Sequence, residues 1–177
     1  MTGVSDPEPS LDLSLGFAAG LEMAFEEAVA VADREGFAFV ELLLDGPYAR
    51  ERIEDRAPEM RATLDEAGVG IVVHLPFAVD PGVPFGPVRA GDVEELTAGM
   101  DLAAELGAEK VVFHPSADVW DLGSDEADTV GFVHEALDDL VPPAREPGLV
   151  PCLENVVSSH YDVAAFPELL DRFPTPR

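Results

Sequence analysis

Apolar positions along the chain follow two alternating patterns. Short, nearly continuous apolar runs, typical of strands in a parallel sheet covered by helices, alternate with longer stretches in which apolar residues recur at helical spacing. The continuous runs predict five strands, over residues 11–17, 37–45, 70–77, 108–116 and 148–156. The helical spacing predicts a helix after each strand, with apolar stripes from Leu21 to Ala32, over 58–67, from Val93 to Leu106, from Val130 to Leu140 and over about 163–172.

Glycine, serine and proline sharpen the ends of these elements. Glycine readily adopts the left-handed conformation found at helix C-termini, and the expected stops of the first three helices are at positions 36, 68 and 107. Ser124 is the expected N-cap of the fourth helix, and Pro142 and Pro143 are expected to end or kink it. The Pro- and Gly-rich stretch 78–91 is expected to be a long loop.

The repeated strand–helix order predicts an α/β fold with a parallel sheet, either doubly wound or a (β/α)₈ TIM-type barrel. The turn after the first strand, GFAAGLE, lacks the third glycine of a dinucleotide-binding fingerprint, which favours the barrel. Five units in 177 residues extrapolate to roughly 280 residues for eight, within the usual range of this barrel. We therefore expect a disordered tail over residues 1–10 and a partial barrel, its first five βα units, over residues 11–177.

Charge is the strongest feature of the composition. The chain has 36 Asp and Glu against 10 Lys and Arg, for a net charge of −26, and Lys110 is its single lysine. In multimolar salt the Debye length falls to about 3 Å, which would screen the repulsion among these carboxylates. The composition therefore favours a halophilic protein in a salt-rich cytoplasm. The acidity also disfavours a nucleic-acid partner, since phosphate binding requires a basic surface.

Other features also favour a cytoplasmic location. Cys152 is the single cysteine, so no disulfide can form within the chain, and we expect it to pack as a small apolar residue. The first ten residues contain neither an apolar core nor a basic run, so they do not resemble a signal peptide. No stretch approaches the roughly 20 continuous apolar residues of a membrane span.

Three residues carry the candidate chemistry. His74, His114 and Glu154 follow one another at intervals of 40 residues (114 − 74 and 154 − 114), each near the end of a predicted strand. Because the carboxyl ends of parallel barrel strands meet at one mouth, with neighbours about 4.8 Å apart, these side chains can converge on one ion. Two imidazoles and a carboxylate suit Mn²⁺, Zn²⁺ or Co²⁺ and leave a position for water or substrate. The competing interpretation is that each residue is structural; His134, in a predicted helix, is interpreted as a surface residue.

Five further residues are candidates for substrate binding. Phe77 and Trp120, in the loops after the third and fourth strands, either form an apolar wall for one face of a sugar or pack on the barrel rim. Glu41, near the end of the second strand, either lines the site or forms a salt bridge. Asn155 directly follows the carboxylate of the fifth strand, and His160 lies in the loop after it.

Four segments give the chain a family resemblance. It resembles the xylose isomerase-like barrel superfamily, which includes sugar phosphate isomerases and epimerases and endonuclease IV-type abasic-site endonucleases. The matching segments are GFAFVEL (36–42), VVHLPF (72–77), LGAEKVVFHPS (106–116) and PCLENV (151–156). In the endonuclease branch the resemblance implies that His74, His114 and Glu154 bind a first metal ion. In the isomerase and epimerase branch it implies that Glu154 is a metal ligand that also accepts a substrate proton.

The chain also departs from the family pattern. Phe77 stands where the endonuclease branch prefers Tyr, and Ser116 where Gly is usual, which favours the isomerase-like branch. The Asp, His and Glu ligands that the resemblance places on later strands do not occur before Arg177.

Three hypotheses follow. The leading one is a divalent-metal-dependent isomerase or epimerase of a small sugar or sugar phosphate, which transfers a proton beside a metal-polarised oxygen. The second is an abasic-site DNA endonuclease. The third is a truncated chain without catalytic activity, or a half-barrel that associates with another chain through the open edges of its sheet.

Overall fold

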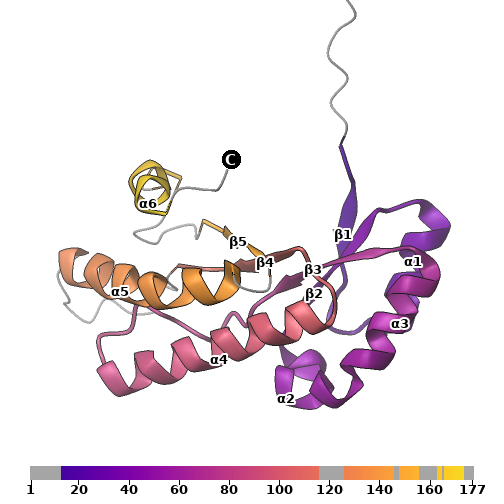
Figure 1. The fold of residues 1–177 in the computed structure, drawn as a ribbon, viewed down its shortest axis with the longest axis horizontal. Coiled ribbons are helices and arrows are strands. Elements are labelled where there is room, and N and C mark those ends of the chain that lie inside the picture. Colours follow the sequence, from indigo (N-terminus) through magenta and orange to yellow (C-terminus); the bar gives the residue numbers. More distant parts are fainter. Residues whose placement is uncertain (1–12, 116–125, 146–147, 156–162, 165, 174–177) are drawn as a thin grey trace, which may run out of the picture.

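The computed structural model describes residues 13–115, 126–145, 148–155, 163–164 and 166–173, and within them five strands alternate with helices (Figure 1). The strands are β1 (Gly16–Ala18), β2 (Phe39–Leu43), β3 (Gly70–His74), β4 (Lys110–Phe113) and β5 (Val150–Leu153). The helices are α1 (Phe25–Glu35), α2 (Arg50–Ile53), α3 (Ala57–Ala67), α4 (Gly86–Glu105), α5 (Glu126–Arg145) and α6 (Phe166–Arg172). Two 3-10 helices, η1 (Gly46–Tyr48) and η2 (Glu54–Arg56), flank α2.

The strand order decides between the two predicted architectures. The five strands are all parallel, and they pair in the order in which they occur in the chain, β1-β2-β3-β4-β5. A doubly wound sheet would reverse its order at a switch point, whereas each strand of a barrel pairs with the next. The barrel-type arrangement is therefore confirmed.

One face of the sheet is packed against helices. The side chains on this face include Val40, Leu42, Val73, Val111 and Phe113, and each is at most 1% exposed. They belong to a single core together with apolar residues of α1, α3, α4 and α5. Side chains alternate between the faces of a strand, and the alternate positions, such as Val72 and Val112, are only partly buried. We call this second side the open face of the sheet.

The first strand is shorter than predicted. Residues 11 and 12 lie outside the described residues, and pairing with β2 begins only at Gly16. Leu13 and Leu15 are 71% and 66% exposed, so the apolar run extends beyond the core that could bury it. The predicted tail over residues 1–10 also lies outside the described residues.

The loop after the third strand is shorter than the predicted stretch 78–91. Helix α4 begins at Gly86, inside the stretch assigned to the loop, with a proline in its first turn. Proline is favourable there because its missing N–H would have no helical partner in any case. Arg89 fixes this first turn: its side chain donates to the Val83 carbonyl and to Glu135, and it lies over the Phe132 ring.

The segment after the second strand is more helical than predicted. The Gly46–Pro47 turn opens η1, and α2 follows it before α3. Burial of Tyr48 and Ile53 anchors this segment to the core. Arg50 ties α2 to α4 through two hydrogen bonds to the Glu95 carboxylate, at 3.0 and 2.8 Å.

The expectation for the prolines was partly wrong, because α5 continues past them to Arg145. Val141 and Ala144 in this last turn are buried, so packing against the core offsets the two lost hydrogen bonds. The predicted N-cap, Ser124, lies outside the described residues. Of the helices in the described ranges, none has the length and apolar character to cross a bilayer.

Candidate metal centre

His74 is the last residue of β3, and its side chain is on the open face. The pairing register places it beside Leu43 of β2 and Val112 of β4. Its neighbour Leu75 continues the ladder, donating its N–H to the Val112 carbonyl at 2.8 Å. Although the open face is only partly covered, His74 is 4% exposed, so its ring is held by its surroundings.

The next two strands bring His114 and Glu154 to the same level. Each residue directly follows its strand, and the Glu154 N–H donates to the Phe113 carbonyl at 3.0 Å. The Oε2 atom of Glu154 lies 3.2 Å from Nε2 of His74 and 3.7 Å from Nε2 of His114. One potential ligand atom from each of the three residues lies within 4.8 Å of the other two. The convergence expected from the strand ends is therefore present.

The hydrogen bonds of His74 indicate which of its ring nitrogens carries a proton. Its Nδ1 lies 2.7 Å from the Leu75 carbonyl oxygen, which can only accept, so Nδ1 is the donor. In the neutral ring, Nε2 then presents a lone pair to the Glu154 carboxylate, which also presents lone pairs. Two such acceptors at 3.2 Å require a cation or a proton between them. A histidine oriented by Nδ1–H bonding to a backbone carbonyl is a common arrangement at metal sites.

Burial also favours the ligating form of the second histidine, His114. Burial lowers the pKa of His114 below its ordinary value, and the nearby His74 lowers this pKa further. The Glu154 carboxylate acts in the opposite direction, raising the pKa of His114. Because a metal binds the neutral imidazole, the net lowering favours the form of His114 that can bind one.

Phe77 covers both histidines. Its ring stacks on His74 with centroids 4.6 Å apart, and lies tilted against His114 at 4.7 Å. Half of the Phe77 side chain remains exposed. Its backbone N–H donates to Oδ2 of Asp45 at 2.9 Å, a contact that connects the ends of β2 and β3. Asp45 was missed by the sequence analysis, which placed it at the end of the second strand without a role.

The other predicted site residues are less directly placed. Glu41 is on the open face, but two residues before Leu43, the residue that pairs with His74. Asn155 is exposed and directly follows Glu154. Trp120 and His160 lie outside the described residues.

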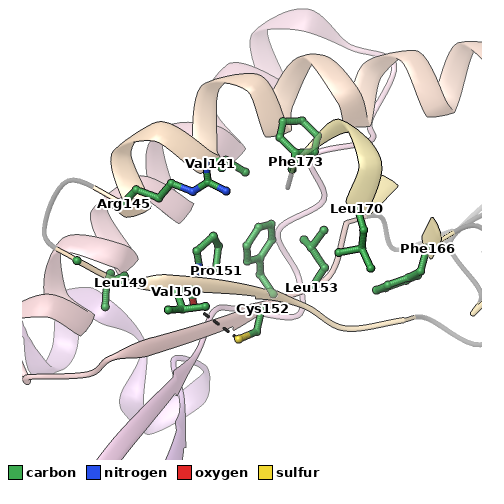
Figure 2. A pocket seen from close by; sticks show the side chains of 12 residues that line it. Val141, Arg145, Leu149, Val150, Pro151, Cys152, Leu153, Phe166, Leu170 and Phe173 are labelled. Atoms are coloured by element: carbon green, nitrogen blue, oxygen red, sulfur yellow. Dashed lines mark hydrogen bonds between the residues drawn. The ribbon is translucent and has the colours of Figure 1, made fainter. Parts of the chain in front are cut away.

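An apolar cavity of about 560 Å³ lies elsewhere, between β5, α5 and α6 (Figure 2). Leu153 of β5, Val141 of α5 and Phe173 at the end of α6 are among its walls. None of the three converging residues lines it. Cys152 also borders this cavity, and burial raises the pKa of its thiol, so the nucleophilic thiolate is disfavoured.

The sequence model of a protein family described as "Xylose isomerase-like TIM barrel" matches residues 29–177. The solved structures that are similar include a D-tagatose 3-epimerase-like protein, with a TM-score of 0.72 and 23% identity over 93% of this chain and 61% of its own. A D-allulose 3-epimerase from Methylomonas sp., solved with D-allulose, has a TM-score of 0.72 and 20% identity over 93% and 60%.

A third similar structure is 3-keto-D-glucoside 4-epimerase from E. coli, with a TM-score of 0.71 and 16% identity over 93% of this chain and 66% of its own. At these identities the likeness establishes the fold. The chain spans about three-fifths of the length of the first two structures. No protein with a curated description matches the chain.

Proposed function

Because the chain belongs to the xylose isomerase-like TIM barrel family, we propose that it is a divalent-metal-dependent, sugar isomerase- or epimerase-like protein. The observation that carries the proposal is the close contact between His74 Nε2 and the Glu154 carboxylate. With Nδ1 of His74 committed to the Leu75 carbonyl, the neutral ring and the carboxylate both present lone pairs across 3.2 Å, and a cation or a proton is needed between them. A divalent cation satisfies both atoms at once, and His114 adds a third donor on the adjacent strand end.

The residues fit such an ion by their chemistry. His74 and His114 would bind it through Nε2 and Glu154 through a carboxylate oxygen, which suits Mn²⁺, Zn²⁺ or Co²⁺. Three protein ligands leave room for a further one from water or substrate. The bound ion would polarise a carbonyl or hydroxyl oxygen of the sugar.

Glu154 is the residue that we propose for proton transfer. Its side chain is 51% exposed, so it can contact a substrate that enters from the open face, whereas His74 is buried. A carboxylate beside a polarised carbonyl can remove a proton from the adjacent carbon and return it. The similar solved structures are consistent with sugar chemistry, since one is a 3-epimerase-like protein, one is a 3-epimerase that contains D-allulose, and one is a 4-epimerase.

The metal content of the purified chain tests the site. We expect about one Mn²⁺ or Zn²⁺ per wild-type chain by plasma mass spectrometry, and loss of that ion in His114→Ala. His134→Ala is the matched control, because His134 is a histidine on α5 and is not one of the three converging residues. If the folded wild type holds no ion, or if both variants lose it equally, the proposed site is wrong.

Substrate assays test the reaction. We expect the metal-loaded chain to exchange a carbon-bound hydrogen of D-fructose or D-allulose with deuterium of the solvent, detected by NMR. Glu154→Gln should abolish the exchange because the amide cannot accept the proton. Exchange at the wild-type rate in Glu154→Gln would contradict the role of Glu154. A metal-loaded wild type that exchanges no sugar hydrogen would contradict the sugar reaction while leaving the metal site intact.

The second candidate is an abasic-site endonuclease. The observation in its favour is the convergence of two histidines and one carboxylate, the ligand set that the family resemblance assigns to the first metal of that branch. Cleavage of a synthetic abasic duplex in the presence of Mn²⁺ or Zn²⁺ would favour this candidate over the sugar reaction. No cleavage under conditions in which the metal is bound would exclude it.

We also retain two predictions about the setting of the protein. A cytoplasmic location follows from the single cysteine and the acidic composition.

Self-association through the edges of the sheet remains the alternative to a catalytic monomer. Sizing chromatography would detect such a dimer. If the dimer dissociates and the monomers keep their metal, the association does not involve the metal site.

A further inference from the structure

The Phe77 ring is the shared neighbour of the two histidines. Its centroid lies 4.6 Å from that of His74 and 4.7 Å from that of His114, while the two imidazoles meet edge to face at 5.1 Å. Three rings in mutual contact restrict one another, so the position of Phe77 affects where both Nε2 atoms point. A shift of the Phe77 ring would remove this contact from both imidazoles.

Phe77 is outside the strand, so the sheet itself does not fix it. The last ladder hydrogen bond of this segment is donated by the N–H of Leu75. The next residue, Pro76, has no N–H. The N–H of Phe77 is therefore the first donor after the strand that can hold the loop, and its partner is Oδ2 of Asp45 at 2.9 Å.

Asp45 is itself firmly placed. The preceding residue, Leu44, donates its N–H to the His74 carbonyl at 2.9 Å, and its side chain is 1% exposed. Asp45 occupies the N-cap position of η1, where aspartate commonly accepts a hydrogen bond from its own helix. Here it makes no such side-chain bond. The carboxylate instead accepts the N–H of Phe77, in the loop that follows β3.

We infer that Asp45 is a positioning residue of the metal centre. Its carboxylate holds the backbone of Phe77, and the Phe77 ring in turn holds the imidazoles of His74 and His114 with their Nε2 atoms toward Glu154. The inference rests on the proposed function for its metal but extends it to a residue that touches neither the ion nor the substrate. Asp45 acts only through Phe77.

Co²⁺ binding followed by visible absorption tests the inference, because the absorption band reports ligand geometry. Asp45→Ala should weaken Co²⁺ binding by about tenfold, the lower end of the usual range for residues that orient metal ligands, and should alter the band. Asp45→Asn keeps an acceptor oxygen and should restore both the affinity and the band. In a Phe77→Ala background Asp45→Ala should have no further effect, because the ring that transmits it is absent.

Asp80→Ala is the matched control. Asp80 also accepts a backbone N–H of the same loop, that of Gly82 at 2.8 Å, and it lies three residues beyond Phe77 in the chain. A change of the band in Asp80→Ala as large as in Asp45→Ala would assign the effect to the loop as a whole and overturn the inference. Additive losses in the Asp45→Ala, Phe77→Ala double variant would also overturn it.

NMR of the imidazole protons in the metal-free chain provides a second test, which does not depend on the ion. In the wild type the Phe77 ring current should shift the ring protons of His74 and His114, and these shifts should collapse in Asp45→Ala and persist in Asp45→Asn. Unchanged shifts in Asp45→Ala would overturn the inference. A wild type that binds no Co²⁺ but shows this pattern would remove the proposed metal and leave Asp45 as the residue that seats Phe77.

Discussion

The two faces of the sheet differ in burial and in chemistry. On the helix-covered face, Val73 and Val111 are inaccessible to solvent and belong to one continuous apolar core. On the open face, the neighbouring Val72 and Val112 remain partly exposed. The three converging side chains, His74, His114 and Glu154, are at the carboxyl end of this open face.

This difference indicates that separate residues stabilise the fold and form the site. Burial of apolar area is the main favourable contribution to folding, and most of it is on the helix-covered face. The open face contributes less burial, so polar groups can be placed there at lower cost. Substitutions that distinguish the faces should therefore separate stability from metal binding.

The adjacent leucines of β2 provide the most sensitive comparison, because they point to opposite faces. Leu42 is 1% exposed in the core, whereas Leu43 is half-buried beside His74. Leu42→Ala should lower the free energy of unfolding by about 2–5 kcal/mol, since it removes buried methyl groups and leaves a cavity. Leu43→Ala should cost about 1 kcal/mol or less.

Urea unfolding followed by circular dichroism measures both leucine variants. Equal losses in the two variants would mean that the open face is buried to the same extent as the other, and that the contrast between the faces is wrong.

Two helix glycines test how tightly the helices approach the sheet. A Cβ added at Gly99 of α4 would lie 2.8 Å from Cδ2 of Leu75, which is fully buried, whereas a Cβ at Gly131 of α5 would meet no atom within 4 Å. Gly131→Ala should raise the midpoint of thermal unfolding, because alanine favours the helix. The gain in the free energy of unfolding should be up to about 1 kcal/mol. Gly99→Ala should instead cost about 1 kcal/mol through overpacking.

Thermal scans of the two glycine variants at fixed salt provide the measurement. Stabilisation of the same size in both would show that α4 is not in close contact with the end of β3.

The smallest expected effect is a pH dependence of stability from the site itself. Burial, with His74 adding to it, lowers the pKa of His114 below 6.5 in the folded chain. The unfolded chain therefore binds more protons as the pH falls below this value, and the free energy of unfolding decreases with it. Well above 6.5 both states leave the ring neutral, so His114 contributes no pH dependence there.

His114→Gln removes this contribution. Between about pH 7.5 and about pH 5.5, in the presence of a chelator, the variant should lose less stability than the wild type. The same loss in both proteins would mean that the imidazole of His114 titrates alike in the folded and unfolded chains.

Much of the site could be predicted because it depends on topology. The register of a parallel sheet brings successive strand ends to one edge, so the positions of His74, His114 and Glu154 in the sequence were sufficient to predict their convergence. The five parallel strands could be predicted because strands of a helix-covered parallel sheet read as nearly continuous apolar runs. The stops at Gly36 and Gly68 were also correct, since both adopt the left-handed conformation.

What could not be predicted depends on how loops fold back. The contact of Asp45 with the Phe77 N–H joins two connections 32 residues apart, and no periodic pattern signals it. The start of α4 at Gly86 was hidden because Pro and Gly indicate both loops and first helical turns. The continuation of α5 past its prolines depends on tertiary packing of Val141 and Ala144. Substrate binding remains a prediction for five residues, Glu41, Phe77, Trp120, Asn155 and His160.

X-ray absorption of the chain loaded with one Zn²⁺ tests the central claim most directly, because it identifies the ligand atoms. The account predicts imidazole scattering from two histidines and a carboxylate oxygen, with first-shell distances of about 2.0–2.2 Å. His114→Ala, which is expected to lose the ion, should show no imidazole scattering around Zn²⁺. A sulfur shell at about 2.3 Å would implicate Cys152, and a shell of water oxygens alone would mean that the three side chains do not bind the ion. Either of these last results would contradict the account.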